Sequence, residues 1–276
     1  MKLRRIISPG RPLAALAWAG LLGLLLGGTP IPTCPLPAKD LPPEQSKEKS
    51  GKAASVPAIA APLVPEKGRF RILLDGKQVG FEDFQISSDG SDAGAKEWMA
   101  HGVTEIRLAD GNAVRVTGRL KLAPGGVPLR YEWSALGEKK ASAAIEFQGS
   151  TAKIALQLEG ARPYIQELTF PSPRVVILDN NLYHHYAVLA RLYDWNAGGV
   201  QTFSVLIPQD MTPGSVTVES LGRAKPDSGE PALSGAEALE LLRVRTADLE
   251  VNLYLDSAHR LVRLGVPASK VDILRE

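Results

Sequence analysis

Two adjacent histidines, His184 and His185, form the most conspicuous polar pair in the chain, which has four histidines in all. Asp179 lies five residues before them. Imidazole and carboxylate groups together suit metal binding or acid–base catalysis. Metal ligands on one helical face need a spacing of three or four residues, however, whereas adjacent residues point about 100° apart. A metal centre would therefore need His101, His259 or carboxylates from elsewhere. The alternative is that one imidazole bonds inside the protein and the other is solvated.

Aromatic residues gather around this pair, although they make up only 6% of the sequence. They either line a ligand cavity or belong to the core. The candidate ligand-binding residues are Tyr183, His184, His185, Tyr186, Tyr193, Trp195 and Phe203.

Sequence motifs that carry chemistry are missing. No Gly-x-Ser-x-Gly, His-Glu-x-x-His or P-loop pattern occurs, and the single cysteine, Cys34, precedes the folded region. We therefore assign no catalytic residue, no metal and no cofactor, and we expect a protein that is not an enzyme.

The histidines belong to a segment with helical periodicity. Apolar residues recur at Leu182, Tyr186, Leu189 and Tyr193, which predicts one long amphipathic helix over residues 181–194. Its start is expected to be capped by Asp179, Asn180 or Asn181, and Gly198-Gly199 to end it.

Strands dominate the rest of the chain after Gly68. Alternating apolar and polar residues predict strands at 70–74, 114–122, 145–148, 153–158, 203–207, 216–218 and 249–255, and pairs such as Asp75-Gly76 and Gly125-Gly126 mark turns. Residues 234–242 fit either a helical capping box or a strand, and we favour the strand. Arg162-Pro163-Tyr164 and the 170–173 segment are expected as loops. The pattern predicts a mainly β fold, a curled antiparallel sheet (a half-barrel or barrel-like meander) whose concave face is covered by the helix.

The N-terminus has the features of a targeting segment. Four basic residues and no acidic one precede an apolar run of 14 residues, 13–26. That run has signal-peptide length and is shorter than the roughly 20 residues of a spanning helix. We therefore expect a signal peptide or N-terminal membrane anchor at 1–33, a Pro-rich disordered linker at 34–67 and a β-rich half-barrel domain at 68–276. Cys34 is a candidate lipidation site, although Pro32 and Thr33 stand where small residues are usual.

The net charge of the chain argues against nucleic acids and anionic membrane surfaces as partners of the folded region. Without the four basic residues of the targeting segment, 28 Lys and Arg face 30 Asp and Glu, so the remaining chain is near neutral. We expect no nucleic-acid binding, contact with a membrane only through the N-terminus, and a location in the periplasm or cell envelope.

Several stretches resemble uncharacterised exported bacterial proteins. Residues 74–82 (LDGKQVGFE) resemble their first hairpin, residues 251–267 (VNLYLDSAHRLVRLGVP) their closing hairpin, and residues 179–194 with 201–210 their middle. These are domains of unknown function whose curled antiparallel sheet is similar to the LolA/LppX-like lipoprotein-carrier fold. The resemblance covers nearly all of 68–276 through turn and strand patterns. It implies an envelope protein with a hydrophobic ligand.

Three functions follow as hypotheses. The first is a non-enzymatic envelope protein that binds a lipid or acyl chain in the concavity of its sheet. The second is an envelope scaffold with a filled core, which binds a protein partner at an exposed sheet edge. The third is a hydrolase or metal-dependent enzyme that uses His184 and His185.

Overall fold

The computed structural model describes residues 63–89, 97–107, 111–224, 239–246 and 249–276. The expected targeting segment, Cys34 and most of the expected linker lie outside these residues. The first strand begins at Glu66, two residues before the expected start of the domain at 68, and Leu63 is already buried in the core. No helix among the residues described has the length and apolar character needed to cross a membrane.

The described chain is mainly β, with fifteen strands, one α-helix and a short 3-10 helix at Pro267–Ser269. The α-helix is α2 (His184–Leu192). The strands are β1 (Glu66–Leu74), β2 (Lys77–Asp89), β3 (Glu97–Arg107), β4 (Ala113–Leu122), β5 (Pro128–Leu136), β6 (Lys140–Gln148), β7 (Thr151–Leu158), β8 (Tyr164–Thr169), β9 (Val175–Ile177), β10 (Val200–Ile207), β11 (Thr212–Arg223), β12 (Glu240–Arg245), β13 (Glu250–Leu255), β14 (Leu261–Val266) and β15 (Val271–Arg275).

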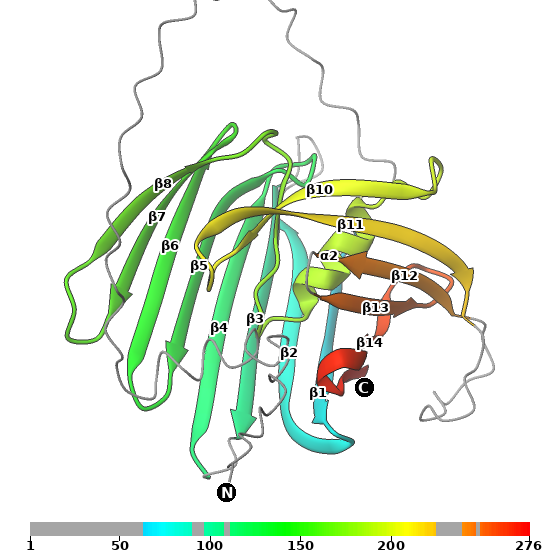
Figure 1. Ribbon diagram of the computed structural model, residues 1–276, viewed down its shortest axis with the longest axis horizontal. Coiled ribbons are helices and arrows are strands. Elements are labelled where there is room, and N and C mark those ends of the chain that lie inside the picture. The colour runs from blue at the N-terminus through cyan, green and yellow to red at the C-terminus, as the bar shows by residue number, and fades with distance from the viewer. Residues whose placement is uncertain (1–62, 90–96, 108–110, 225–238, 247–248) are drawn as a thin grey trace, which may run out of the picture.

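All fifteen strands form one sheet, in the order β8 to β1, then β15 to β9. The first and last strands, β1 and β15, pair in its middle, so the two halves of the chain wind outward from a common seam. The sheet curls strongly, which brings β8 into contact with β11 and β5 into contact with β9 (Figure 1). The expected sheet was fully antiparallel, but β9 pairs parallel to β10, because the chain passes through α2 between them.

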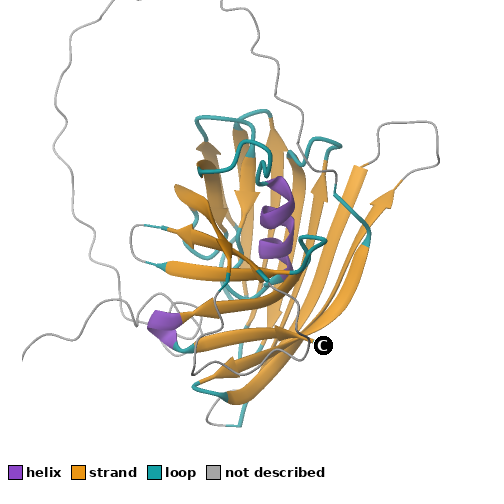
Figure 2. Cartoon of the chain, turned by 90° about the vertical axis from the view of Figure 1, so that its right-hand side faces the viewer, coloured by secondary structure: helices purple, strands orange, loops and turns teal. Residues whose placement is uncertain are grey.

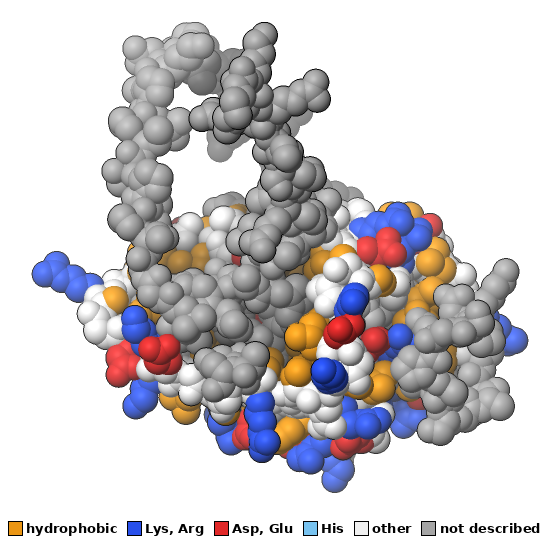
Figure 3. Space-filling model, turned by 60° about the horizontal axis from the view of Figure 1, so that its bottom comes forward, with side chains coloured by type: hydrophobic (Ala, Val, Ile, Leu, Met, Phe, Trp, Pro, Cys, Tyr) orange, Lys and Arg blue, Asp and Glu red, His pale blue; other side chains and the backbone are white. Residues whose placement is uncertain are grey.

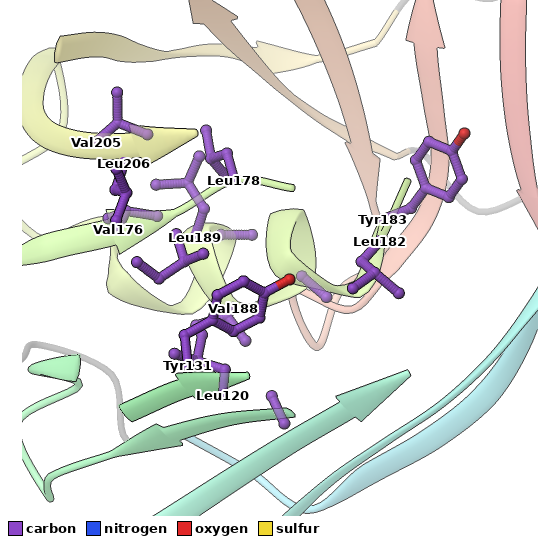
Figure 4. Packing of buried hydrophobic residues seen from close by; sticks show 14 of the residues in the cluster. Leu120, Tyr131, Val176, Leu178, Leu182, Tyr183, Val188, Leu189, Val205 and Leu206 are labelled. Atoms are coloured by element: carbon purple, nitrogen blue, oxygen red, sulfur yellow. The ribbon is translucent and has the colours of Figure 1, made fainter. Parts of the chain in front are cut away.

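Alternation of side chains places the core on one face of this sheet. In β4 the even-numbered residues from Val114 to Leu122 are buried, and residues of the same parity are buried in β2 and β3. The segment 178–193 packs among these inward side chains, and Figure 4 shows Val188 and Leu189 of α2 beside Tyr131 and Val176. Figure 2 shows α2 surrounded by strands.

The helix is shorter than the sequence predicts, and its pattern was misread. It has nine residues instead of fourteen, and it is buried around most of its circumference, not along one stripe. The residue at its N-terminal cap is Tyr183, whose side chain makes no capping bond, and the helix ends at Leu192, before Gly198-Gly199. Leu182 and Tyr193 continue the helical spacing by coincidence, since Leu182 precedes the helix and Tyr193 follows it in extended backbone.

Turn and strand predictions agree better with the structure. Asp75 and Gly76 join β1 to β2 with φ angles of 50° and 75°, the left-handed pair of a tight hairpin turn. Tyr164 was expected in a loop, but it begins β8. Strand β12 begins at Glu240, and residues 234–238 of the ambiguous stretch lie outside the described residues. On the face shown in Figure 3, acidic and basic side chains are interspersed among apolar ones.

Candidate functional site

The two histidines occupy the first two positions of α2, and both are fully buried. Sequence reasoning expected one of them to reach solvent, since adjacent helical residues diverge. That expectation is wrong, because the N-terminal turn of α2 is enclosed by the inner face of β2–β5 on one side and by its own incoming segment on the other.

Two glycines make room for this segment. Gly102 of β3 and Gly118 of β4 are opposite each other in the sheet register, and both belong to the inward face. A Cβ atom on Gly102 would lie 2.6 Å from the His184 ring, and one on Gly118 would lie 2.2 Å from Leu182. The absence of side chains at these two positions therefore forms a depression in the sheet that receives the start of α2.

The residue at the N-terminal cap of α2 makes no capping bond, and Glu82 of β2 caps the helix instead. Its Oε2 atom accepts the backbone N–H groups of Tyr183, at 2.8 Å, and His184, at 3.3 Å. Its Oε1 atom lies 2.5 Å from Nδ1 of His184. A carboxyl at a helix N-terminus meets both unpaired N–H groups and the positive end of the helix dipole. One side chain of the sheet thus fixes the position, direction and first side chain of the helix.

A second buried chain of bonds fixes His185. Its Nδ1 atom accepts the backbone N–H of Asp179 at 3.2 Å, so the neutral ring carries its proton on Nε2. The carboxylate of Asp179 accepts the Tyr131 hydroxyl at 2.8 Å and the N–H of Asn181 at 2.9 Å. Thr104 completes this support by donating to the carbonyl of Asn181 at 2.6 Å.

Burial governs the charge states of the group. It raises the pKa of Glu82 well above its usual 4.5, although the two backbone N–H groups act in the opposite direction. Burial lowers the pKa of His184 from 6.5 to about 3 and that of His185 well below 6.5. It also raises the pKa of Asp179. Glu82 and His184 therefore form a neutral pair that shares one proton between Oε1 and Nδ1.

Unpartnered atoms remain at the centre of this network. The two rings meet edge to face with their centroids 4.5 Å apart, and Nε2 of both His184 and His185 is buried without a hydrogen-bond partner among the described residues. Buried polar groups of this kind commonly bond an internal water molecule.

The chemistry open to the group is limited by its burial. A carboxyl–imidazole pair can exchange a proton, but Glu82, His184 and His185 have no exposed surface through which a substrate would meet them. Among the described residues no group of three or more His, Cys, Asp or Glu side chains is placed to hold a metal ion. The geometry shows that Glu82 and its hydrogen bonds hold the start of α2 in position.

The other candidate residues lie elsewhere. Tyr193 and Trp195 follow the C-terminal end of α2, and the Trp195 indole stacks on His259 with centroids 3.9 Å apart. The hydroxyl of Tyr193 donates to the carbonyl of Gly199 at 2.7 Å. Phe203 is half-buried on β10, and Tyr186 is partly buried against the core. The seven predicted residues are thus divided among the two ends of α2 and strand β10.

Sequence reasoning missed Glu82, Gly102, Thr104 and Tyr131. A signal for Glu82 was present, since it is in phase with Phe84 and Ile86 on an apolar strand face, where a carboxyl needs a partner. Nothing in the sequence shows that its partner is 102 residues away.

No family model matches the chain, and no curated protein sequence matches it. Among solved structures, the chain is similar to a β-barrel-like protein of the domain of unknown function DUF1849 from Brucella abortus. The TM-score is 0.47 at 11% identity, covering 78% of this chain and 95% of that chain.

Proposed function

We propose that this protein is a non-enzymatic protein of the cell envelope that binds an extended segment of another protein along the edge of β8 that pairs with no described strand. The observation that carries this proposal is that this edge strand exposes large apolar side chains. Strand β8 ends the sheet, and Tyr164 and Ile165 at its start are among the most exposed large apolar residues of the described chain. An exposed apolar edge strand is a ready template for an added strand.

Backbone geometry defines the groups that a partner strand would meet. The N–H of Phe170 donates to Ser150 across the β7–β8 ladder. Since the two sides of a strand alternate, Gln166 and Leu168 also face β7, while the N–H and C=O groups of Ile165 and Glu167 point away from it. A partner strand with apolar residues beside Ile165 and a basic residue opposite Glu167 fits this edge.

The interior supports a binding role over an enzymatic one. The His184–Glu82 pair is enclosed, and its bonds are used to hold α2 in place. Location in the envelope rests on the targeting segment of residues 1–33 alone.

An apolar ligand in the concavity, a lipid or an acyl chain, is the second candidate. The inward face of β1–β7 is apolar over most of its length, which favours such a ligand. Side chains of α2 and its flanks now pack against that face, so the ligand would enter only if α2 moved. Native mass spectrometry of the wild-type protein and Glu82→Ala from a membrane-containing host tests this: a lipid retained by either protein supports it, and its absence from both opposes it.

The edge proposal is tested by site-specific photo-crosslinking in intact cells. A crosslinking residue replaces Ile165, and the control replaces Val200, which is equally exposed (62% against 63%) but is not on β8. We expect a discrete protein adduct from position 165 and none from position 200. The adduct should disappear in Glu167→Pro, which removes an outward N–H that β7 does not use. Equal adducts from both positions, or persistence of the adduct in Glu167→Pro, would contradict edge pairing.

A further inference from the structure

A small pocket lies on the outward face of the sheet, opposite the buried network. Its volume is about 220 Å³, and five residues line it: Gln85, Ser87, Met99, His101 and Arg119. Gln85, His101 and Arg119 are adjacent across β2, β3 and β4 in one register row, and Ser87 and Met99 are adjacent in the next. None of the lining residues belongs to the site described above.

Arg119 is the one cation among the lining residues, and its cross-strand neighbour Glu132 pairs with Arg130 instead. Arg119 makes no ion pair with any acidic residue in the described part of the chain, whereas its neighbours on the same strand are paired: Arg115 with Glu105 at 2.6 Å and Lys121 with Glu97 at 2.6 Å. No acidic side chain among the described residues lines the pocket. An exposed guanidinium with its fork of donors free is suited to a planar oxyanion.

The remaining lining groups are three neutral hydrogen-bonding side chains and the apolar side chain of Met99. Burial and the neighbouring Arg119 lower the pKa of His101 below 6.5, so its ring is uncharged at neutral pH and offers one N–H. Gln85 and Ser87 offer an amide and a hydroxyl, and Met99 offers an adaptable apolar contact. A ligand with a single negative charge therefore matches the positive charge of Arg119 and the neutral donors beside it.

We propose that this pocket binds the carboxylate of a small aliphatic acid, with its carboxylate on Arg119 and its hydrocarbon end on Met99. A doubly charged phosphate would leave one charge without a counter-charge among the described lining residues. The volume of the pocket, smaller than the 300–1,000 Å³ typical of sites for drug-sized ligands, suits a small acid. The proposal is independent of edge binding at β8, because it uses neither that strand nor its backbone.

Methyl NMR of the whole protein tests the proposal. The chain has only three methionines, so ε-¹³CH₃-methionine labelling gives a simple spectrum in which Met99 reports on the pocket and Met211 on the fold. The probes are butyrate, its neutral analogue butyramide, and inorganic phosphate. We expect a saturable shift of the Met99 signal with butyrate, a much weaker response to the other two, and an unchanged Met211 signal.

Two matched variants locate the charge. Arg119→Gln should weaken butyrate binding by about tenfold or more, the effect of losing a charge-assisted hydrogen bond. Arg115→Gln removes the same charge from the same strand face outside the pocket and should leave the affinity unchanged. The proposal is overturned if Met99 shows no saturable shift with butyrate. It is overturned equally if butyramide or phosphate binds as well as butyrate, or if both variants lose affinity alike.

Discussion

Glu82 and His184 meet at 2.5 Å inside the protein, although 102 residues separate them in the chain. The contact joins β2, near the central seam of the sheet, to the first residue of its only described α-helix. Because Glu82 also accepts two backbone N–H groups at the helix start, one side chain serves as cap, anchor and proton partner. The stability of α2 in its place therefore depends on a residue of the sheet.

Replacement of Glu82 tests this dependence. Glu82→Ala leaves two N–H groups and an imidazole nitrogen buried without partners, and we expect it to lower the free energy of unfolding by about 3–5 kcal/mol. Glu82→Gln keeps an acceptor for the N–H groups and a donor for the ring, so its loss should be near 1 kcal/mol. Urea unfolding followed by circular dichroism measures both. Equal losses in the two variants would show that the contact is not specific.

Gly102 offers a test that leaves Glu82 and His184 intact. A Cβ atom at this position would lie 2.6 Å from both Glu82 Oε1 and His184 Nδ1, so Gly102→Ala must push the pair apart. We expect a loss of about 1–3 kcal/mol. Gly265→Ala is the control, since its Cβ would meet only Asp272 Oδ1 at 3.6 Å, an ordinary contact, and the change should stay within about 0.5 kcal/mol. Thermal unfolding that ranks the two variants in the opposite order would refute the close fit.

The sequence predicts the strands far better than their assembly. Residues 114–122 alternate cleanly, and β4 has the predicted bounds to within one residue with its predicted face inward. Alternation is local, so it needs no knowledge of neighbours. The parallel pairing of β9 with β10 and the central pairing of β1 with β15 are contacts between distant segments, which no local pattern encodes.

The site illustrates the same limit. The sequence shows His184 and His185 as a polar pair, yet their contacts are with Glu82 and Gly102, which come from strands about 80 to 100 residues earlier. A helical stripe was read along residues 181–194, but a helix buried on nearly all sides has no stripe, so its length was overestimated.

Export is a prediction from residues 1–33 that cell fractionation can test. We expect the full chain in the envelope fraction and a chain lacking residues 2–33 in the cytoplasm, because the basic and apolar stretch is lost. Cys34→Ser separates two modes of attachment. Release of this variant from the membrane fraction would identify a lipid on Cys34, and retention would identify an apolar anchor. A full chain that stays in the cytoplasm would contradict export.

The buried titratable groups predict two opposite pH dependences. The pKa of His185 is lowered in the folded state, so below about 6.5 the unfolded chain binds a proton that the folded chain does not. The stability contributed by this neutral ring is fully present above that pH and is lost as the pH falls. The pKa of Glu82 is raised, so its contribution is fully present below about 4.5 and is lost as the pH rises toward the folded pKa.

Difference measurements separate these two effects. The free energy of unfolding of wild type minus that of His185→Gln should be constant above about pH 6.5 and should fall below it by up to about 1.4 kcal/mol per pH unit. Glutamine keeps an acceptor for the Asp179 N–H, so the comparison isolates the titration. The same difference for Glu82→Gln should have the opposite sign of slope above about pH 4.5. Urea unfolding between pH 4 and pH 8 gives both curves. Flat curves for both variants would contradict the prediction, because they would mean that each group has the same pKa in the folded and the unfolded chain.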